Sequence, residues 1–292
     1  MATQFDKGKS FRALHARAGA FIIPNPWNAG TVRLLEHAGF EALATTSAGY
    51  AFSAGRADGS VARGEMIGHI EDIVSATCLP VSADLENGYG DDPDTIAATI
   101  RLAATAGAVG GSIEDFAGPH ADRPLYDIGL AAERISAAAE AARVLPFPFT
   151  LTARAENYLA GKPDLRDTIA RLQAYQEAGA DVLYAPGINA EEDIAAVVAS
   201  VDRPVNVVVG VRGAQLNLAR LAALGVKRVS VGSALSRVAL GALLRAVGEM
   251  REQGSFAFSD EAAGYGDLNC LFEECTSKKA VLRHAQALRA AY

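Results

Sequence analysis

Cysteine is scarce in this chain and forms no recognisable pattern. The three residues, Cys78, Cys270 and Cys275, include no Cys-x-x-Cys spacing of the kind found in redox and zinc sites. An odd number of cysteines also argues against a disulfide framework. We therefore interpret all three as reduced thiols without a catalytic role.

Long hydrophobic runs and blocks of one charge are also missing. Nowhere do eighteen apolar residues follow one another without a charge, and the N-terminal residues lack the apolar core of a signal peptide. The net charge of -7 is spread along the chain, with no basic block and no stripe of basic and aromatic residues. We therefore expect a cytoplasmic protein that binds neither membranes nor nucleic acid.

No linker divides the 292 residues, and no Gly-x-Gly-x-x-Gly motif opens a predicted helix. The missing motif argues against a dinucleotide-binding sheet. Half of the residues are hydrophobic, which is enough for one large core. We expect a single domain over residues 1–292.

Short β-branched runs alternate with longer segments rich in Ala, Leu, Glu and Arg. The predicted strands are 21–24, 42–46, 80–84, 109–114, 149–153, 182–185, 205–209 and 226–231, and the helices between them are 31–37, 94–106, 130–142, 166–178, 191–200 and 216–224. Several helices end in Ala-Gly, a common helix C-cap, just before the next strand. Eight such units over about 230 residues predict an α/β fold, the (β/α)8 TIM barrel.

Two further helices are predicted beyond the eighth strand, at 233–253 and 271–291, in a C-terminal extension that spans 233–292. A barrel does not need them, so their apolar faces must be buried elsewhere. Either a neighbouring subunit or the chain's own barrel could cover them. We favour the first alternative, which predicts a homo-oligomer.

Acidic residues follow two neighbouring strands, at the barrel end where active sites lie. Asp84 and Glu86 follow the third strand, and Glu114 follows the fourth. In extended backbone, side chains two residues apart leave a strand on the same side. Clustered carboxylates repel one another unless a cation lies among them, and oxygen ligands suit Mg²⁺ or Mn²⁺. We predict a metal site at Asp84, Glu86 and Glu114; the alternative is that one of them caps a helix or lies in a solvated loop.

Arg154 follows the fifth strand, among these acids. It is either a salt-bridge strut or a clamp for an anionic substrate, and we favour the clamp because guanidinium binds carboxylate bidentately. Glu156 would then hold the arginine or belong to the metal shell. Asp58, in a polar segment with glycines, is either a loop acid or a catalytic one. Asn206, in the seventh strand, is a candidate for substrate binding.

Three segments together carry a resemblance to a known family. They are FIIPNPWNAGTVRLLEHAGFEALATTSAGYA at 21–51, VSADLENGYGDDPDTIAATIRLAATAGAVGGSIEDF at 81–116 and LTARAENYL at 151–159. In these segments the chain resembles the isocitrate lyase / phosphoenolpyruvate mutase superfamily. The resemblance implies a (β/α)8 barrel that binds Mg²⁺ through Asp84 directly and through Glu86 and Glu114 largely by way of water.

The resemblance also implies roles for the residues around the metal. The substrate would be a small oxo- or hydroxy-acid whose carboxylate is held by Arg154, with Asp58 near the reacting group. Thr46, Ser47 and Ala48 match positions that present backbone amides and a serine to the substrate. Members of the superfamily commonly form tetramers, as dimers of dimers, with C-terminal helices exchanged between subunits.

Departures from the superfamily bear on the reaction. The isocitrate and methylisocitrate lyases carry a Lys-Lys/Arg-Cys-Gly motif after the fourth strand, and the loop at 115–127 lacks it. The gating-loop residues of the mutases are missing too, and Leu-Tyr-Ala-Pro at 183–186 replaces their histidine. His120 and Arg123 in the loop could protonate or neutralise an anion instead. Tyr50 either faces the pocket or packs in the core.

The retained parts are those that stabilise an enolate. We predict a Mg²⁺-dependent lyase that cleaves a C–C bond of a small 2-oxo or 2-hydroxy carboxylic acid, like oxaloacetate decarboxylase or methylisocitrate lyase. The alternatives are a C–P phosphonomutase or phosphonopyruvate hydrolase, and a non-catalytic metabolite-binding relative. The catalytic candidates are Asp58, Arg154, Glu114 and His120; the substrate-binding candidates are Thr46, Ser47, Ala48, Tyr50, Asp84, Arg154 and Asn206.

Overall fold

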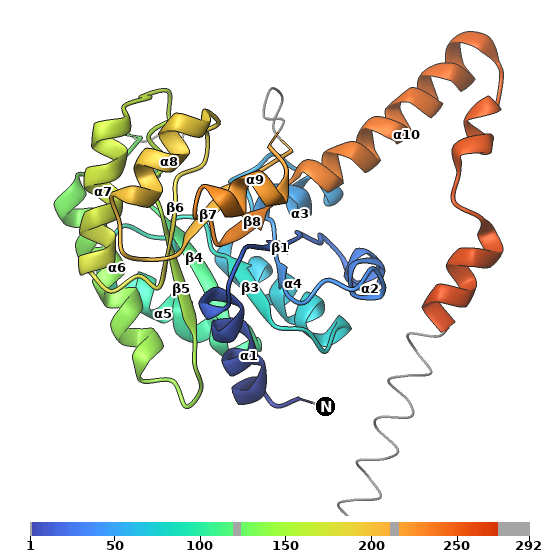
Figure 1. Cartoon of the computed structure of the whole chain (residues 1–292). Coiled ribbons are helices and arrows are strands. Elements are labelled where there is room, and N and C mark those ends of the chain that lie inside the picture. Colours follow the sequence, from blue (N-terminus) through green and yellow to red (C-terminus); the bar gives the residue numbers. More distant parts are fainter. Residues whose placement is uncertain (1, 119–123, 211–215, 274–292) are drawn as a thin grey trace, which may run out of the picture.

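The computed structural model describes residues 2–118, 124–210 and 216–273. Its strands form one parallel sheet in the order β1-β8-β7-β6-β5-β4-β3-β2 (Figure 1). The Ala44 N–H donates to the Pro24 carbonyl at 3.1 Å, which joins β2 to the end of β1 and nearly closes the sheet. The predicted (β/α)8 barrel is confirmed. The strands are β1 (Phe21–Ile23), β2 (Leu43–Ala44), β3 (Val81–Asp84), β4 (Gly110–Glu114), β5 (Thr150–Arg154), β6 (Val182–Tyr184), β7 (Val205–Val208) and β8 (Arg228–Ser230).

Helices alternate with the strands and cover the outside of the barrel, as Figure 1 shows. After β1 to β4 come α2 (Ala29–His37), α3 (Ser47–Ser53) with α4 (Arg63–Ala76), α5 (Pro93–Thr105) and α6 (Ile128–Arg143). After β5 to β8 come α7 (Leu165–Glu177), α8 (Glu191–Ala199), α9 (Leu218–Ala223) and α10 (Ala234–Gln253). A short 3-10 helix, η1 (Ala257–Glu261), follows α10.

Local chemistry explains where these helices begin and end. The Asp92 side chain accepts from the Thr95 N–H at 2.8 Å, and Pro93 occupies the first helical position of α5. At the predicted Ala-Gly stops, Gly39 and Gly107 have φ angles of 86° and 96°. This left-handed conformation ends the helix and turns the chain into the next strand.

The helix α1 (Gln4–Ala16) was not among the predicted elements. Thr3 and Asp6 form a reciprocal capping box at its start. Its buried Phe11 and Leu14 pack with Phe21 and Ile23 at the end of the barrel where the strands begin. The helix α1 thus closes the barrel on the side opposite the strand ends.

The helix α10 leaves the barrel and projects from it (Figure 1). It confirms the helix predicted at 233–253, while the one predicted at 271–291 lies almost wholly outside the described residues. Val238 and Leu244 are 68% and 70% exposed, and Ser236 is the one buried residue of the helix. Beyond its first turn, α10 is therefore not covered by the described part of its own barrel.

Membrane insertion has no candidate segment in the described part of the chain. None of its helices combines the length and the apolar character needed to cross a bilayer.

Candidate active site

A cavity of about 240 Å³ opens at the carboxyl ends of the strands. It lies where the barrel fold places active sites. Its lining includes the predicted residues Thr46, Ser47, Ala48, Asp58, Asp84, Arg154 and Asn206. Residues that come from five separate segments of the sequence are thus brought together by closure of the sheet.

Arg154, the last residue of β5, joins three carboxylates. Its Nε, Nη1 and Nη2 atoms lie 2.8 Å from Glu156 Oε1, 3.0 Å from Asp84 Oδ1 and 2.9 Å from Glu114 Oε2. The side chain is 15% exposed, so these pairs are largely shielded from water. The carboxylates hold the pKa of Arg154 well above its ordinary value, against the opposing effect of burial. The guanidinium is therefore a fixed positive charge.

Asp84, at the end of β3, receives further hydrogen bonds from the start of α3. The Ser47 N–H and the Ser47 hydroxyl both donate to Asp84 Oδ2 at 3.0 Å. Thr46 caps α3 by accepting from the Gly49 N–H, and this fixes the direction of the Ser47 amide. With Arg154 on Oδ1, both oxygens of Asp84 are held in place.

Glu86 does not continue the extended backbone of β3. The prediction that the Glu86 and Asp84 side chains leave the strand on the same side assumed extended backbone as far as Glu86, and this assumption was wrong. The strand ends at Asp84, and Glu86 has a φ of 49°. Tyr89 also has a positive φ, 66°, so two non-glycine residues of this turn are strained. A sequence pattern based on strand periodicity cannot anticipate such a turn.

Buried Arg134, on α6, holds this turn. Its Nη1 donates to the carbonyls of Gly90 and Asp91 at 2.7 Å and 2.8 Å, and its Nη2 donates to the carbonyl of Asn87. The guanidinium also lies 3.9 Å from the centre of the Tyr126 ring. Arg134 thus holds the strained turn together with the Glu114 N–H, which donates to the Glu86 carbonyl at 3.0 Å.

The acids of the site are hard to ionise together. Burial, with the charges of Asp84 and Asp58, raises the pKa of Glu86 to about 8. Burial, then Asp84, raises the pKa of Asp58. Burial also raises the pKa of Glu114 well above its ordinary value in spite of Arg154. Carboxyl groups that resist ionisation near one another are the setting in which a bound cation restores the charged form.

A divalent cation fits this donor set in part. Glu86 Oε1 is buried and has no hydrogen-bond partner among the described residues, so it is an orphaned oxygen beside Asp84. Within the same residues, however, no three His, Cys, Asp or Glu side chains are grouped as ligands of one ion. The predicted convergence of Asp84, Glu86 and Glu114 on one ion is therefore not seen among these residues, and Asp84 and Glu114 are both paired with Arg154 instead. The residues suit an ion with few direct protein ligands and several waters.

Three other predicted residues have different positions. Asn206 lines the cavity, but its amide is already used: Nδ2 donates to Ser230 Oγ at 3.0 Å, and Oδ1 accepts from Arg228 Nε at 2.8 Å. Tyr50 is not among the lining residues; its ring stacks on His69 and its hydroxyl donates to Glu65. These contacts favour the packing role of Tyr50. His120 lies outside the described residues.

Arg228 lines the cavity and was missed by the sequence analysis. It is 5% exposed on β8, and its guanidinium donates to Asn206 and to Thr152 Oγ1. It has no ion pair with a described carboxylate, and burial lowers its pKa to about 10. An arginine inside a strand that is covered on both faces was the available signal, because such a charge needs a reason to be there.

Comparisons with known proteins place the chain in a family. Residues 11–251 match the family model described as phosphoenolpyruvate phosphomutase. A solved structure from Burkholderia cenocepacia J2315, provisionally described as a lyase/mutase, shares 64% identity and a TM-score of 0.90, over 92% of this chain and 96% of that one. The oxaloacetate decarboxylase of Chromohalobacter salexigens is 29% identical over 86% of this chain and 88% of its own length.

A third relative was solved with bound ligands. It is a phosphonopyruvate hydrolase in complex with oxalate and Mg²⁺, with 25% identity and a TM-score of 0.80 over 100% of this chain and 99% of that one. The family match spans most of the chain and includes the whole barrel. The chain therefore belongs to the phosphoenolpyruvate phosphomutase family, within the isocitrate lyase / phosphoenolpyruvate mutase superfamily of lyases and mutases.

Proposed function

We propose that the protein is a divalent-metal-dependent lyase that cleaves a C–C bond of a small 2-oxo or 2-hydroxy carboxylic acid. The observation that carries the proposal is Arg154, which lines a small cavity with Asp84 and is paired with Asp84, Glu114 and Glu156. The cavity volume of about 240 Å³ suits a substrate of few carbon atoms. Such a site can hold a carboxylate and gather the negative charge of an enolate.

Arg154 can hold substrate in addition to its three acids. A guanidinium has five N–H donors, and the three ion pairs engage one donor on each nitrogen. The remaining donors on Nη1 and Nη2 can meet a substrate carboxylate bidentately. Two alternative roles for Arg154 were predicted from the sequence, a salt-bridge strut and a clamp for an anionic substrate. The side chain can then serve in both roles.

Buried Arg228 gives the cavity floor a second positive charge. Its polar partners are Asn206, Thr152 and His15, and none of them is a carboxylate, so its charge is available to an anion in the cavity. A substrate with two negative groups could meet the remaining donors of Arg154 with one group and Arg228 with the other. We therefore favour a dicarboxylic acid over a monocarboxylic one.

The position of Asp58 and its raised pKa suit it to transfer a proton. It lines the cavity, and Ser47 Oγ lies 3.4 Å from its Oδ1. Because burial and the charge of Asp84 raise the pKa of Asp58, it holds a proton more readily than a surface aspartate does. Asp58 would accept a proton from a substrate hydroxyl or return one to the product carbon.

Mg²⁺ or Mn²⁺ is the cofactor that these residues would hold, with Asp84 as the direct ligand and with Glu86 and Glu114 acting through water. When bound, the ion supplies a Lewis-acid charge that lowers the energy of an enolate. The chain's own part is to fix Asp84 through Ser47 and Arg154, and to keep Glu86 in place through the turn held by Arg134.

The test is a product assay with purified protein and Mg²⁺, in which oxaloacetate, 2-methylisocitrate and phosphonopyruvate are offered separately. We expect pyruvate from a carboxylate substrate, and we expect EDTA to abolish its release and excess Mg²⁺ to restore it. Pyruvate with phosphate from phosphonopyruvate would instead support C–P chemistry. Turnover that EDTA leaves unchanged would contradict the metal-dependent proposal.

We further propose that the chain assembles as a homotetramer, a dimer of dimers, in which α10 is exchanged between subunits. Apolar side chains of α10 are exposed: Leu243 is 57% and Leu244 70% exposed. Contact with another chain would bury them. Light scattering after gel filtration should give the mass of four chains, and Leu244→Glu should give smaller species. Exposed Glu252→Gln at the end of α10 is the matched control, and a monomeric unmodified protein would contradict the assembly.

A further inference from the structure

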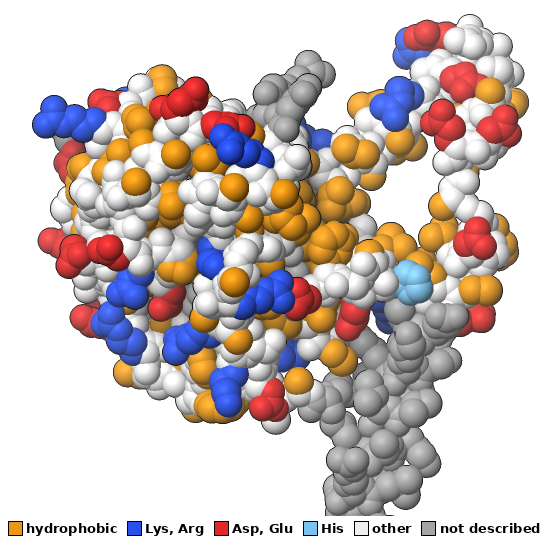
Figure 2. Space-filling model, viewed as in Figure 1, with side chains coloured by type: hydrophobic (Ala, Val, Ile, Leu, Met, Phe, Trp, Pro, Cys, Tyr) orange, Lys and Arg blue, Asp and Glu red, His pale blue; other side chains and the backbone are white. Residues whose placement is uncertain are grey.

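A second and larger cavity, of about 590 Å³, lies at the opposite end of the barrel, where the strands begin. Its walls are α1, the end of α6, the segment 145–149 and the turn before β6. Figure 1 shows α1 on this side, and Figure 2 shows basic side chains gathered there on the lower half of the same face. No residue that lines the active-site cavity lines this one.

Three arginines line this cavity: Arg12 from α1, Arg143 from the end of α6, and Arg203 from the segment before β7. Among the described residues, none of the three has an ion pair with a carboxylate or donates a hydrogen bond. Of the described residues that line the cavity, Asp181 is the one acid, and it accepts from the Leu151 N–H at 2.8 Å. Three positive charges thus face one negative charge, on a protein whose net charge is -7.

The backbone is shaped to bring these arginines together. At Gly179, where φ is 103°, a Cβ would collide with the guanidinium of Arg143, so glycine lets this side chain lie against the turn. At Gly8, a Cβ would collide with the carbonyl of Pro148. The helix α1 can therefore press directly against the segment 145–149 and complete the wall.

The rest of the wall is apolar and partly aromatic. It includes Phe5, Leu145, Pro146 and Phe147, and Phe5 is 49% exposed. Guanidinium groups bind both carboxylate and phosphate bidentately, but a phosphate monoester carries close to two negative charges on three oxygens, so it can meet more than one of these arginines at once. An exposed ring and a proline offer a flat surface for a planar group. A ligand that combines a phosphate with a flat ring uses both parts of the cavity.

We propose that this cavity binds a nucleoside monophosphate, with the phosphate among Arg12, Arg143 and Arg203 and the base against Phe5 and Phe147. The volume is in the range of small-molecule sites. The strand β5 connects the two ends of the barrel: Leu151 lines the second cavity, and Arg154 lies in the active site. A bound nucleotide would therefore contact the strand that carries the main cation of the active site.

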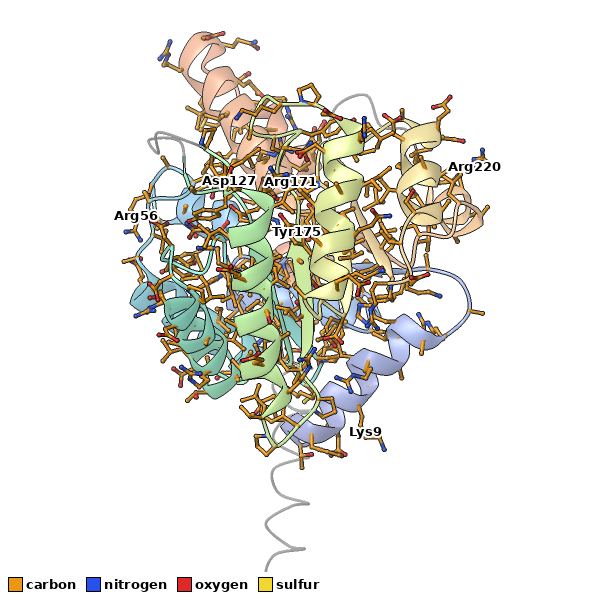
Figure 3. The ribbon with its side chains drawn as sticks, turned by 90° about the vertical axis from the view of Figure 1, so that its left-hand side faces the viewer. Lys9, Arg56, Asp127, Arg171, Tyr175 and Arg220 are labelled. Carbon is orange, nitrogen blue, oxygen red and sulfur yellow. The ribbon has the colours of Figure 1, made fainter. Side chains whose placement is uncertain are left out.

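Isothermal titration of the full chain with AMP tests the proposal directly, without any need for turnover. We expect one saturable site per chain, and we expect Arg143→Gln and Arg203→Gln each to weaken the affinity at least about tenfold, the loss of one charged hydrogen bond. Arg220→Gln is the matched control, because Arg220 is exposed and paired with Glu191 away from the cavity (Figure 3). Arg154→Gln should bind AMP as the unmodified protein does.

Two further ligands separate the parts of the cavity. Adenosine lacks the phosphate and inorganic phosphate lacks the ring, so both should bind at least about tenfold more weakly than AMP. The absence of saturable AMP binding would overturn the proposal, as would binding that neither arginine variant weakens or that Arg154→Gln abolishes. Phosphate that binds as tightly as AMP would overturn the nucleotide assignment.

Discussion

Replacing Arg154 by lysine should lower kcat/KM for the substrate by about two to four orders of magnitude. Lysine keeps the charge but is a point donor, so it cannot hold Asp84, Glu114 and Glu156 together and still meet a carboxylate. Two lost charged hydrogen bonds correspond to about 3–6 kcal/mol, which sets the expected range. Steady-state kinetics should show a raised KM as well as a lowered kcat.

The control for this prediction is Arg171→Lys. Arg171 is also a buried arginine that joins two acids, Asp115 and Asp167, but it does not line the cavity. Both variants should lose thermal stability, because a single ammonium cannot replace all the hydrogen bonds that the guanidinium donates to its buried acids. Arg171→Lys should nevertheless keep most of the kcat/KM of the folded protein. An equal loss of kcat/KM in both variants would reduce Arg154 to a structural strut.

The barrel was predictable because its signals are local and repeated. The strands are short, mostly apolar runs, several helices begin with a side-chain cap, and an Ala-Gly stop recurs at the ends of α2, α5 and α7. The rule that active sites lie at the carboxyl ends of strands then selected Asp84 and Arg154 without any tertiary information. Both residues line the cavity, and Arg154 Nη1 lies 3.0 Å from Asp84 Oδ1.

The parts that escaped prediction depend on contacts between distant segments. The turn at Glu86 is set by Arg134, which lies 48 positions later and binds three carbonyls of the turn. The ion pair between Glu114 and Arg154 follows from the pairing of β4 with β5, which places these two residues opposite each other. The local pattern showed which acids lie at the site but not which of them Arg154 neutralises.

Arg228, which has no ion pair with a described carboxylate, is a second residue whose position depends on contacts between distant segments. The sequence shows a charged residue inside this strand, but the height of that residue in the barrel is set by register: Arg228 is opposite Asn206 on β7 and Phe21 on β1. Sequence periodicity gives the face of a strand but not the level at which its neighbours meet. The floor of the cavity could therefore be described only once the strand order was known.

Asp84→Asn should weaken the affinity for Mg²⁺ and lower activity at saturating substrate by more than about 100-fold. Removing a partner that merely orients a metal ligand already costs 10- to 100-fold, so the loss of a direct ligand should exceed it. Asparagine also disrupts the hydrogen bonds around this position, in addition to removing the charge. Asp84 accepts from Ser47 on one oxygen and from Arg154 on the other, and an amide NH₂ must face one of these donors.

The measurement is a titration of activity with Mg²⁺, alongside calorimetry of Mg²⁺ binding to the protein without substrate. Asp92→Asn is the matched control, since Asp92 is the exposed N-cap of α5 and asparagine caps a helix equally well. It should leave the Mg²⁺ titration unchanged. If Asp84→Asn also left it unchanged, Asp84 would not be the ligand. The acids of this site would then serve only to hold Arg154, and the charge that stabilises an enolate would have to come from Arg154 and Arg228.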